Sequence, residues 1–157
     1  MSAVDLLAIW AIGIGYETDI KTQVILNNLV GWGEDSFESI CFNLIIQKKI
    51  FGNAFAEIVR DRETGALVNL KPLWTGDMRV FVDENGLIDH YEQHSGGAIK
   101  SFKPEQIFCL VNDRIANEIH GQSIIDSVHW VIDARNEAMS DWRRISHRST
   151  IRGRTKS

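Results

Sequence analysis

The stretch Gly52-Asn-Ala-Phe-Ala-Glu-Ile-Val-Arg60 decides how this chain folds, because the spacing of the apolar residues changes there. Before it, apolar residues at helical spacing predict an amphipathic helix over 35–50, capped by Asp35 or Ser36. After it, from residue 54 to 110, apolar and polar residues alternate, which is typical of strands. The glycine at the boundary ends the helix, so the stretch marks a helix-to-sheet corner.

Short strand-like segments separated by turn residues fill the middle of the chain. Asp61-Arg-Glu-Thr-Gly65 and Asp83-Glu-Asn-Gly86 are typical of hairpin turns, and Pro72 interrupts the segment between them. The pattern predicts an antiparallel β-meander of about six short strands, at 55–60, 66–70, 78–82, 87–93, 99–102 and 107–111.

Helical patterns occupy both ends of the chain. Val4 to Ile14 is apolar and fits a strand or a short buried helix, since periodicity does not choose between them. Residues 20–30 come close to helical spacing. Gly121-Gln-Ser123 introduces the longest helix, with Ser123 as its cap. The fold class is therefore α+β, with N-terminal helices, the meander and a long C-terminal helix.

Composition excludes several classes of protein. With 157 residues, 44% apolar and 24% charged, the chain has enough apolar content for one globular domain and is not disordered. The apolar start is about ten residues long, too short to cross a bilayer of ~30 Å, and it lacks a basic flank. Cys41 and Cys109 lie in apolar runs and predict buried thiols; two cysteines without a C-x-x-C pair exclude a thiolate zinc site.

Charge is distributed unevenly along the chain. Residues 1–142 hold eleven Lys and Arg against all 21 Asp and Glu, a balance of −10. Residues 143–157 hold no acid and six basic side chains: Arg143, Arg144, Arg148, Arg152, Arg154 and Lys156. Such a basic helix end is suited to a phosphate backbone or to an acidic protein surface.

Residues with catalytic potential do not assemble into a recognisable motif. His90 and His94 are four apart on a strand and are expected to be solvated, and His120 lies in a loop between acids. The glycine pairs lack the third glycine of a dinucleotide fingerprint. Trp74, Trp130 and Trp142 lie in patterns that core packing explains. A hydrolase with a carboxylate pair remains open as the weakest hypothesis, and no metal or cofactor is predicted.

Four short motifs follow one another along residues 34–148. They are the strand Gly52–Asp61, the step Leu70-Lys-Pro-Leu73, the strand Phe102-Lys-Pro-Glu-Gln-Ile107 and the helix start Gly121-Gln-Ser123. In this order the motifs resemble the portal proteins of tailed bacteriophages and related prophages. Residues 1–33 match no part of that family that we can place.

The resemblance implies a structural, non-enzymatic virion protein. Portal proteins form a ring, usually of twelve copies, at one capsid vertex, through which double-stranded DNA is packaged and ejected. The implied partners are other copies of the chain, the large terminase subunit, the major capsid protein, head–tail adaptor proteins and the DNA in the channel, with no membrane. Assembly would occur in the host cytoplasm.

The resemblance also implies a division of the chain. Residues 34–121 would be a wing-like α+β domain, 122–148 a stem-like helix, and 149–157 a basic tail leading toward a missing clip. Gly52 and Asn53 would form the helix-to-sheet corner, and Gly121 and Ser123 the wing-to-stem corner. Family members are several-fold longer, so we expect a fragment without the second stem helix, the clip and the crown.

The charge division has two explanations under this resemblance. An acidic channel lets DNA slide without anchoring, and the balance of −10 suits that role. The basic residues would then contact DNA or, as we favour, an acidic neighbouring subunit. The alternative function is a stand-alone nucleic-acid-binding α+β module that uses the basic C-terminal helix.

Overall fold

The computed structural model describes residues 2–13 and 15–153, with side chains up to residue 147. The chain divides into two units, 1–123 and 124–157, and each is described by itself. The first unit contains α1 (Ala3–Ile12), α2 (Ile20–Asn27), α3 (Phe37–Phe51), β1 (Asn53–Arg60), β2 (Leu67–Leu73), β3 (Met78–Val82), β4 (Ile88–Ser95), β5 (Ala98–Phe102) and β6 (Ile107–Val111), with short 3₁₀ turns at Thr75–Asp77 and Pro104–Gln106. The second contains α4 (Ile124–Gly153).

Capping residues set where the N-terminal helices begin. Ser2 and Asp5 cap the start of α1 reciprocally, so the apolar first segment is a helix rather than a strand. Ser36 and Ser39 do the same for α3, which selects Ser36 over Asp35 as its cap. The helix predicted over 35–50 is thus confirmed.

The six predicted strands are confirmed, but their pairing differs from a simple meander. They form two antiparallel three-stranded sheets, in the orders β2-β1-β6 and β3-β4-β5. The last strand returns to the first, with Phe55 opposite Cys109, instead of pairing with β5. Pro72 does not interrupt β2 as expected. It lies within this edge strand, where a residue without an N–H is tolerated.

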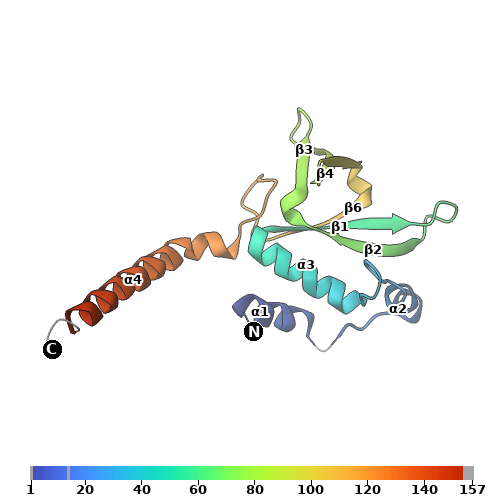
Figure 1. Cartoon of the computed structure of the whole chain (residues 1–157). Coiled ribbons are helices and arrows are strands. Elements are labelled where there is room, and N and C mark those ends of the chain that lie inside the picture. The colour runs from blue at the N-terminus through green and yellow to red at the C-terminus, as the bar shows by residue number, and fades with distance from the viewer. Residues whose placement is uncertain (1, 14, 154–157) are drawn as a thin grey trace. The chain divides into compact units, whose positions relative to one another are not determined.

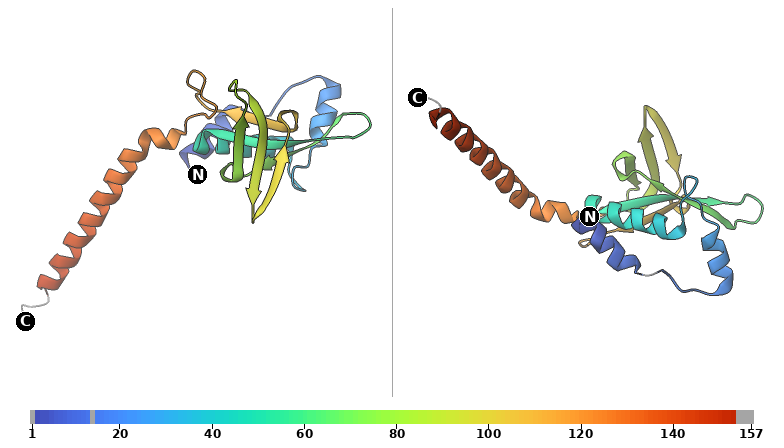
Figure 2. Two further views of the ribbon diagram at one scale, coloured as in Figure 1. Left: turned by 90° about the horizontal axis from the view of Figure 1, so that it is seen from above. Right: turned by 60° about the horizontal axis from the view of Figure 1, so that its bottom comes forward.

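Strand β1 is buried on both faces, and this explains the pairing. Ala54 and Ala56 pack in one apolar cluster with Ile40 and Leu44 of α3. Phe55, which points the other way, packs in a second cluster with residues that include Tyr91 and Phe102 of the other sheet. The small alanines let α3 approach the sheet closely, and α3 lies between this sheet and α1 (Figures 1 and 2).

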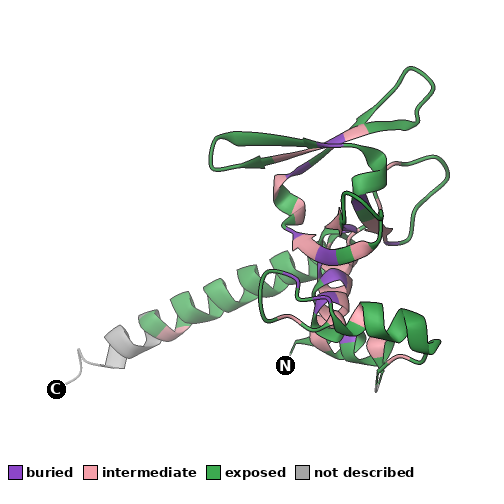
Figure 3. Ribbon diagram, turned by 90° about the vertical axis from the view of Figure 1, so that its right-hand side faces the viewer, coloured by how far each residue is buried: buried purple, intermediate pink, exposed green. Residues whose placement is uncertain are grey.

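Helix α4 is 30 residues long, about 45 Å at 1.5 Å per residue. It continues through Gly153, beyond the predicted end at 148. Every residue from 126 to 145 is exposed, as the colouring of Figure 3 shows.

Candidate functional site

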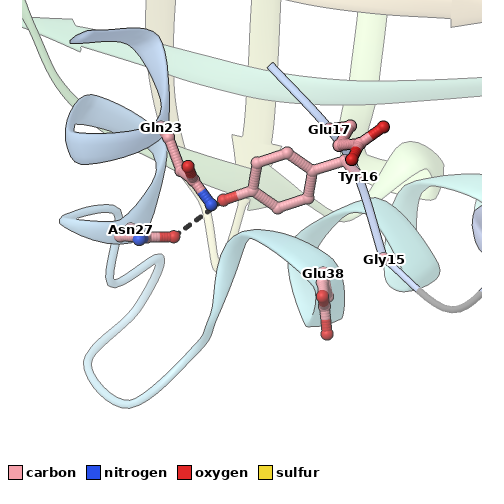
Figure 4. A pocket seen from close by; sticks show the side chains of 6 residues that line it. All are labelled: Gly15, Tyr16, Glu17, Gln23, Asn27 and Glu38. Carbon is pink, nitrogen blue, oxygen red and sulfur yellow. Dashed lines mark hydrogen bonds between the residues drawn. The ribbon is translucent and has the colours of Figure 1, made fainter. Parts of the chain in front are cut away.

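A polar hollow of about 440 Å³ lies beside the linker that follows α1 (Figure 4). The Tyr16 hydroxyl donates a 2.8 Å hydrogen bond to Oδ1 of Asn27, and the Tyr16 ring meets Phe37 edge-on, 4.9 Å between centroids. These contacts attach the linker to α2 and α3. The residues described around the hollow offer two carboxylates, a phenol and amides, but no serine, cysteine, lysine or histidine: Gly15, Tyr16, Glu17, Gln23, Asn27 and Glu38.

The strand histidines lie closer together than the sequence suggested. His94 Nε2 is 2.8 Å from one Glu92 oxygen, and His90 Nε2 is 3.6 Å from the other. Strand alternation places these three side chains on one face of β4. His90 also stacks on Phe81, with 4.5 Å between ring centroids. Within residues 2–13 and 15–153, no group of three or more His, Cys, Asp or Glu side chains could hold a metal ion.

Both cysteines are free thiols, and both are half-buried rather than fully buried as predicted. Burial raises the pKa of Cys41, with a smaller contribution from Glu38. Burial also raises the pKa of Cys109 to about 11. Since the thiolate is the nucleophile, both side chains are poorly reactive at neutral pH.

The end of α3 touches the segment that precedes α4. Gly52 adopts φ +79°, and a Cβ atom there would stand 2.1 Å from the carbonyl oxygen of Gly121. A Cβ on Gly121 would stand 2.2 Å from the carbonyl oxygen of Asn112. Because backbone occupies both positions, only glycine fits at either one.

The four predicted corner residues therefore lie together. Oδ1 of Asn53 accepts a 3.1 Å hydrogen bond from the Gly121 amide, and Nδ2 of Asn53 lies 2.8 Å from Nδ1 of His120. The Ser123 hydroxyl donates to the carbonyl of Ile50. The last turn of α3 and the start of β1 thus hold the chain immediately before α4.

Asn112, which the sequence analysis did not single out, is the centre of this corner. It is 2% exposed. Its amide donates to the Gly52 carbonyl at 2.8 Å, and its Oδ1 accepts from Lys49 Nζ at 2.8 Å. Its Nδ2 donates to the Gln122 carbonyl, also at 2.8 Å. The sequence feature that could have identified Asn112 is its position as an asparagine directly after the apolar strand 107–111.

The basic residues of the C-terminal run are only partly described. Arg143 and Arg144 are exposed, and Arg144 lies 3.6 Å from Asp141, a surface pair of little energetic weight. Arg148 and Arg152 belong to α4, but their side chains lie outside the described residues. Arg154 and Lys156 lie outside the described residues altogether.

An apolar stripe follows α4 along its length. Val128, Val131, Ala138, Trp142 and Ile145 recur three and four apart and so share one face, which Arg135 interrupts. Trp142 is 65% exposed, and Trp130, off the stripe, is 72% exposed. Trp74 is 56% exposed, so the expectation that core packing explains these tryptophans is wrong.

Trp10 and Trp32 are exposed as well, which makes all five tryptophans of the chain surface residues. Large exposed aromatic side chains are typical of interaction surfaces. Among the helices described, none is both long enough and apolar enough to span a membrane.

Comparison with known proteins relates the chain to structures rather than to sequences. No protein-family model matches it, and no curated protein matches it. A chain in the virion of a native gene transfer agent (GTA) particle shares 22% identity over 90% of this chain and 39% of that chain, with a TM-score of 0.73. A chain in the neck of the native GTA particle, computed with C12 symmetry, shares 21% identity over 92% of this chain and 41% of its own, with a TM-score of 0.69.

An HK97 family phage portal protein from Corynebacterium diphtheriae is also similar, with 16% identity, coverage of 76% of this chain and 37% of its own, and a TM-score of 0.51. The chain thus spans about two fifths of the length of the solved chains it matches. At these identities the likeness establishes the fold. The chain has the fold of part of a phage portal protein, which confirms the resemblance seen in the sequence and the α+β class.

Proposed function

We propose that this chain is a structural, non-catalytic subunit of a portal-like ring in the virion of a tailed phage or prophage. Copies of the chain surround a channel for double-stranded DNA at a capsid vertex, with the large terminase subunit, the major capsid protein and head–tail adaptors as further partners. The fold supports this proposal, as does the C12 symmetry of a solved neck assembly that contains a similar chain.

The single observation that carries the proposal is the exposed apolar stripe of α4. Helices in proteins are stabilised mainly by tertiary packing of one face, and between residues 126 and 145 no side chain of α4 is buried. Such a stripe is suited to packing against another helix. Helices of neighbouring copies in a ring supply that partner.

The parts of the chain take corresponding roles. Residues 34–121 act as the wing-like domain, 122–148 as the stem-like helix, and 149–157 lead toward the clip. The corner around Gly52 and Gly121 forms the end of the wing-like part. We place the basic run of α4 against an acidic surface of a neighbouring copy.

The test compares two tryptophans that lie on different faces of α4. Trp142→Glu puts a charge on the stripe, and Trp130→Glu makes the same change off it. We expect sedimentation velocity to show concentration-dependent oligomers for the wild-type chain and for Trp130→Glu, and a monomer for Trp142→Glu. A wild-type chain that stays monomeric at millimolar concentration would overturn the assignment of the stripe to contacts between copies.

Duplex DNA binding separates the proposal from its alternative. A stand-alone nucleic-acid-binding module would bind a short duplex as a monomer. The slope of its log affinity against log salt concentration would fall by about one in Arg143→Ala, because one phosphate contact is lost. Fluorescence anisotropy is expected to show weak binding that Arg143→Ala does not change. Tight binding by the monomer would support the alternative.

A further inference from the structure

Helix α1 exposes an apolar face that nothing in the described chain covers. Leu6, Leu7 and Trp10 are 52%, 47% and 89% exposed, and their spacing of three and four residues places them on one side of the helix. Ala8, fully buried, lies on the side that packs toward α3. Helices that are apolar all round are normally buried, so this face needs a partner.

A second apolar surface lies between α3 and the sheet β2-β1-β6. It is a groove of about 380 Å³, lined by side chains of α3, including Phe37, Cys41 and Ile45, and of the strands, including Ile58. Arg60 is the one charged residue in its lining. A space of that size holds roughly a dozen waters at ~30 Å³ each, comparable to Trp10 together with a neighbouring leucine.

We infer that α1 of one copy of this chain inserts into the groove of a second copy, with Trp10 as the anchor. Head-to-tail contacts in a cyclic ring join two different patches of the same chain, one on each side of the contact. The outward face of α1 and this groove are two such patches. A solved neck assembly that contains a similar chain has C12 symmetry, the kind of arrangement in which head-to-tail contacts of this type occur.

The chain cannot make this contact with itself. The outward face of α1 points away from α3, because the opposite face, with Ala8, is the one that packs on it. The groove lies on the sheet side of α3, whereas α1 lies on the other side of that helix (Figures 1 and 2). A second copy can therefore supply the apolar side chains that fill the groove, which α1 of the same chain does not reach.

Site-directed cross-linking tests the contact directly, with Phe108, which lines the groove and is 40% exposed, as the attachment point. In a background with Cys41→Ser and Cys109→Ala, the pair Leu6→Cys and Phe108→Cys with a short bis-maleimide should give a ladder of dimers, trimers and higher oligomers on a denaturing gel. Leaving Phe108 in place should abolish the ladder. Ile99→Cys is the matched control, because Ile99 is similarly exposed, at 63%, on β5 and away from α1; it should give no ladder.

Sedimentation of Trp10→Glu provides a second measurement. Loss of a buried aromatic anchor should weaken self-association at least about tenfold, while circular dichroism shows an unchanged fold. Because the inference rests on the proposed ring, the two can fail separately. Oligomers that respond to Trp142→Glu, without a ladder and without an effect of Trp10→Glu, would overturn the α1 contact alone.

Two further outcomes are informative. A monomeric wild-type chain would overturn both contacts between copies, that of the α4 stripe and that of α1. Binding of the chain to phosphatidylcholine–phosphatidylglycerol vesicles through Trp10, without a ladder, would make a lipid surface the occupant and overturn the inferred contact.

Discussion

Alanine at Gly52 should destabilise the protein far more than alanine at Gly86, although both glycines have the same φ. Each adopts φ +79°. A Cβ on Gly86 would meet nothing within 4 Å, whereas a Cβ on Gly52 would stand 2.1 Å from the carbonyl oxygen of Gly121. Comparing the two alanine variants therefore separates the free-energy cost of a left-handed backbone from that of a steric clash of the added Cβ atom.

The expected costs follow from these two geometries. A left-handed conformation costs an alanine about 1–2 kcal/mol, partly offset by the lower entropy of the unfolded chain. At Gly52 the clash adds about 2–3 kcal/mol, because relief would move backbone that carries the bond from the Asn112 amide to the Gly52 carbonyl. At about 3–4 °C per kcal/mol, the Tm of Gly52→Ala should lie roughly 6–12 °C below that of Gly86→Ala.

Thermal unfolding followed by circular dichroism measures the difference, with both variants at the same protein concentration. The reasoning predicts the order wild type, Gly86→Ala, Gly52→Ala. Equal Tm values for the two variants would show that the Gly52–Gly121 approach is not a tight contact, and the description of the corner would be wrong.

Three further predictions concern single side chains. Asn112→Ala should lower the free energy of unfolding by about 2–3 kcal/mol in urea titrations, because Lys49 and the Gln122 carbonyl lose buried partners. The control Asn136→Ala, at an exposed position, should change it by less than about 0.5 kcal/mol. Because burial raises the folded pKa of Cys109 to about 11, its contribution to stability should be full below pH 9 and fall as pH rises toward 11. Cys109→Ala should make that slope shallower, leaving the part contributed by Cys41 and Tyr91, and an unchanged slope would contradict the assignment. Hydrogen bonds from the Leu87 amide and then from Asn85 lower the pKa of Asp83, so its stabilising effect should be present above pH 4 and decline below it. In Asp83→Asn, the free energy of unfolding should therefore fall less steeply below pH 4 than it does in the wild type.

Much of the secondary structure could be predicted because local signals are strong here. The helix 37–51 has a serine cap, an apolar face and a terminal glycine, and the hairpin turns carry the Asp and Gly residues that such turns require. The pairing of the last strand with the first could not be predicted in this way. It joins residues about 50 positions apart, and its cause is the burial of β1 on both faces.

The candidate site shows the same limit. The glycines at 52 and 121 were recognisable as corners, but their mutual contact and the buried Asn112 beneath them were not, since no local pattern reports a close approach of two backbones. The tryptophans were misjudged for a related reason. Helical spacing shows which side chains share a face, but not whether anything covers that face.

The sequence by itself determined the α+β class, the position of the helix-to-sheet corner, the long C-terminal helix and the resemblance to portal proteins. These depend on residue types and spacings within short segments, which act on the backbone locally. Only the tertiary structure decided that the strands divide into two sheets, that Gly52, Asn112 and Gly121 meet, and that α1 and α4 keep apolar faces exposed. Those features depend on which distant segments bury one another, because apolar burial is non-directional and carries no local signature.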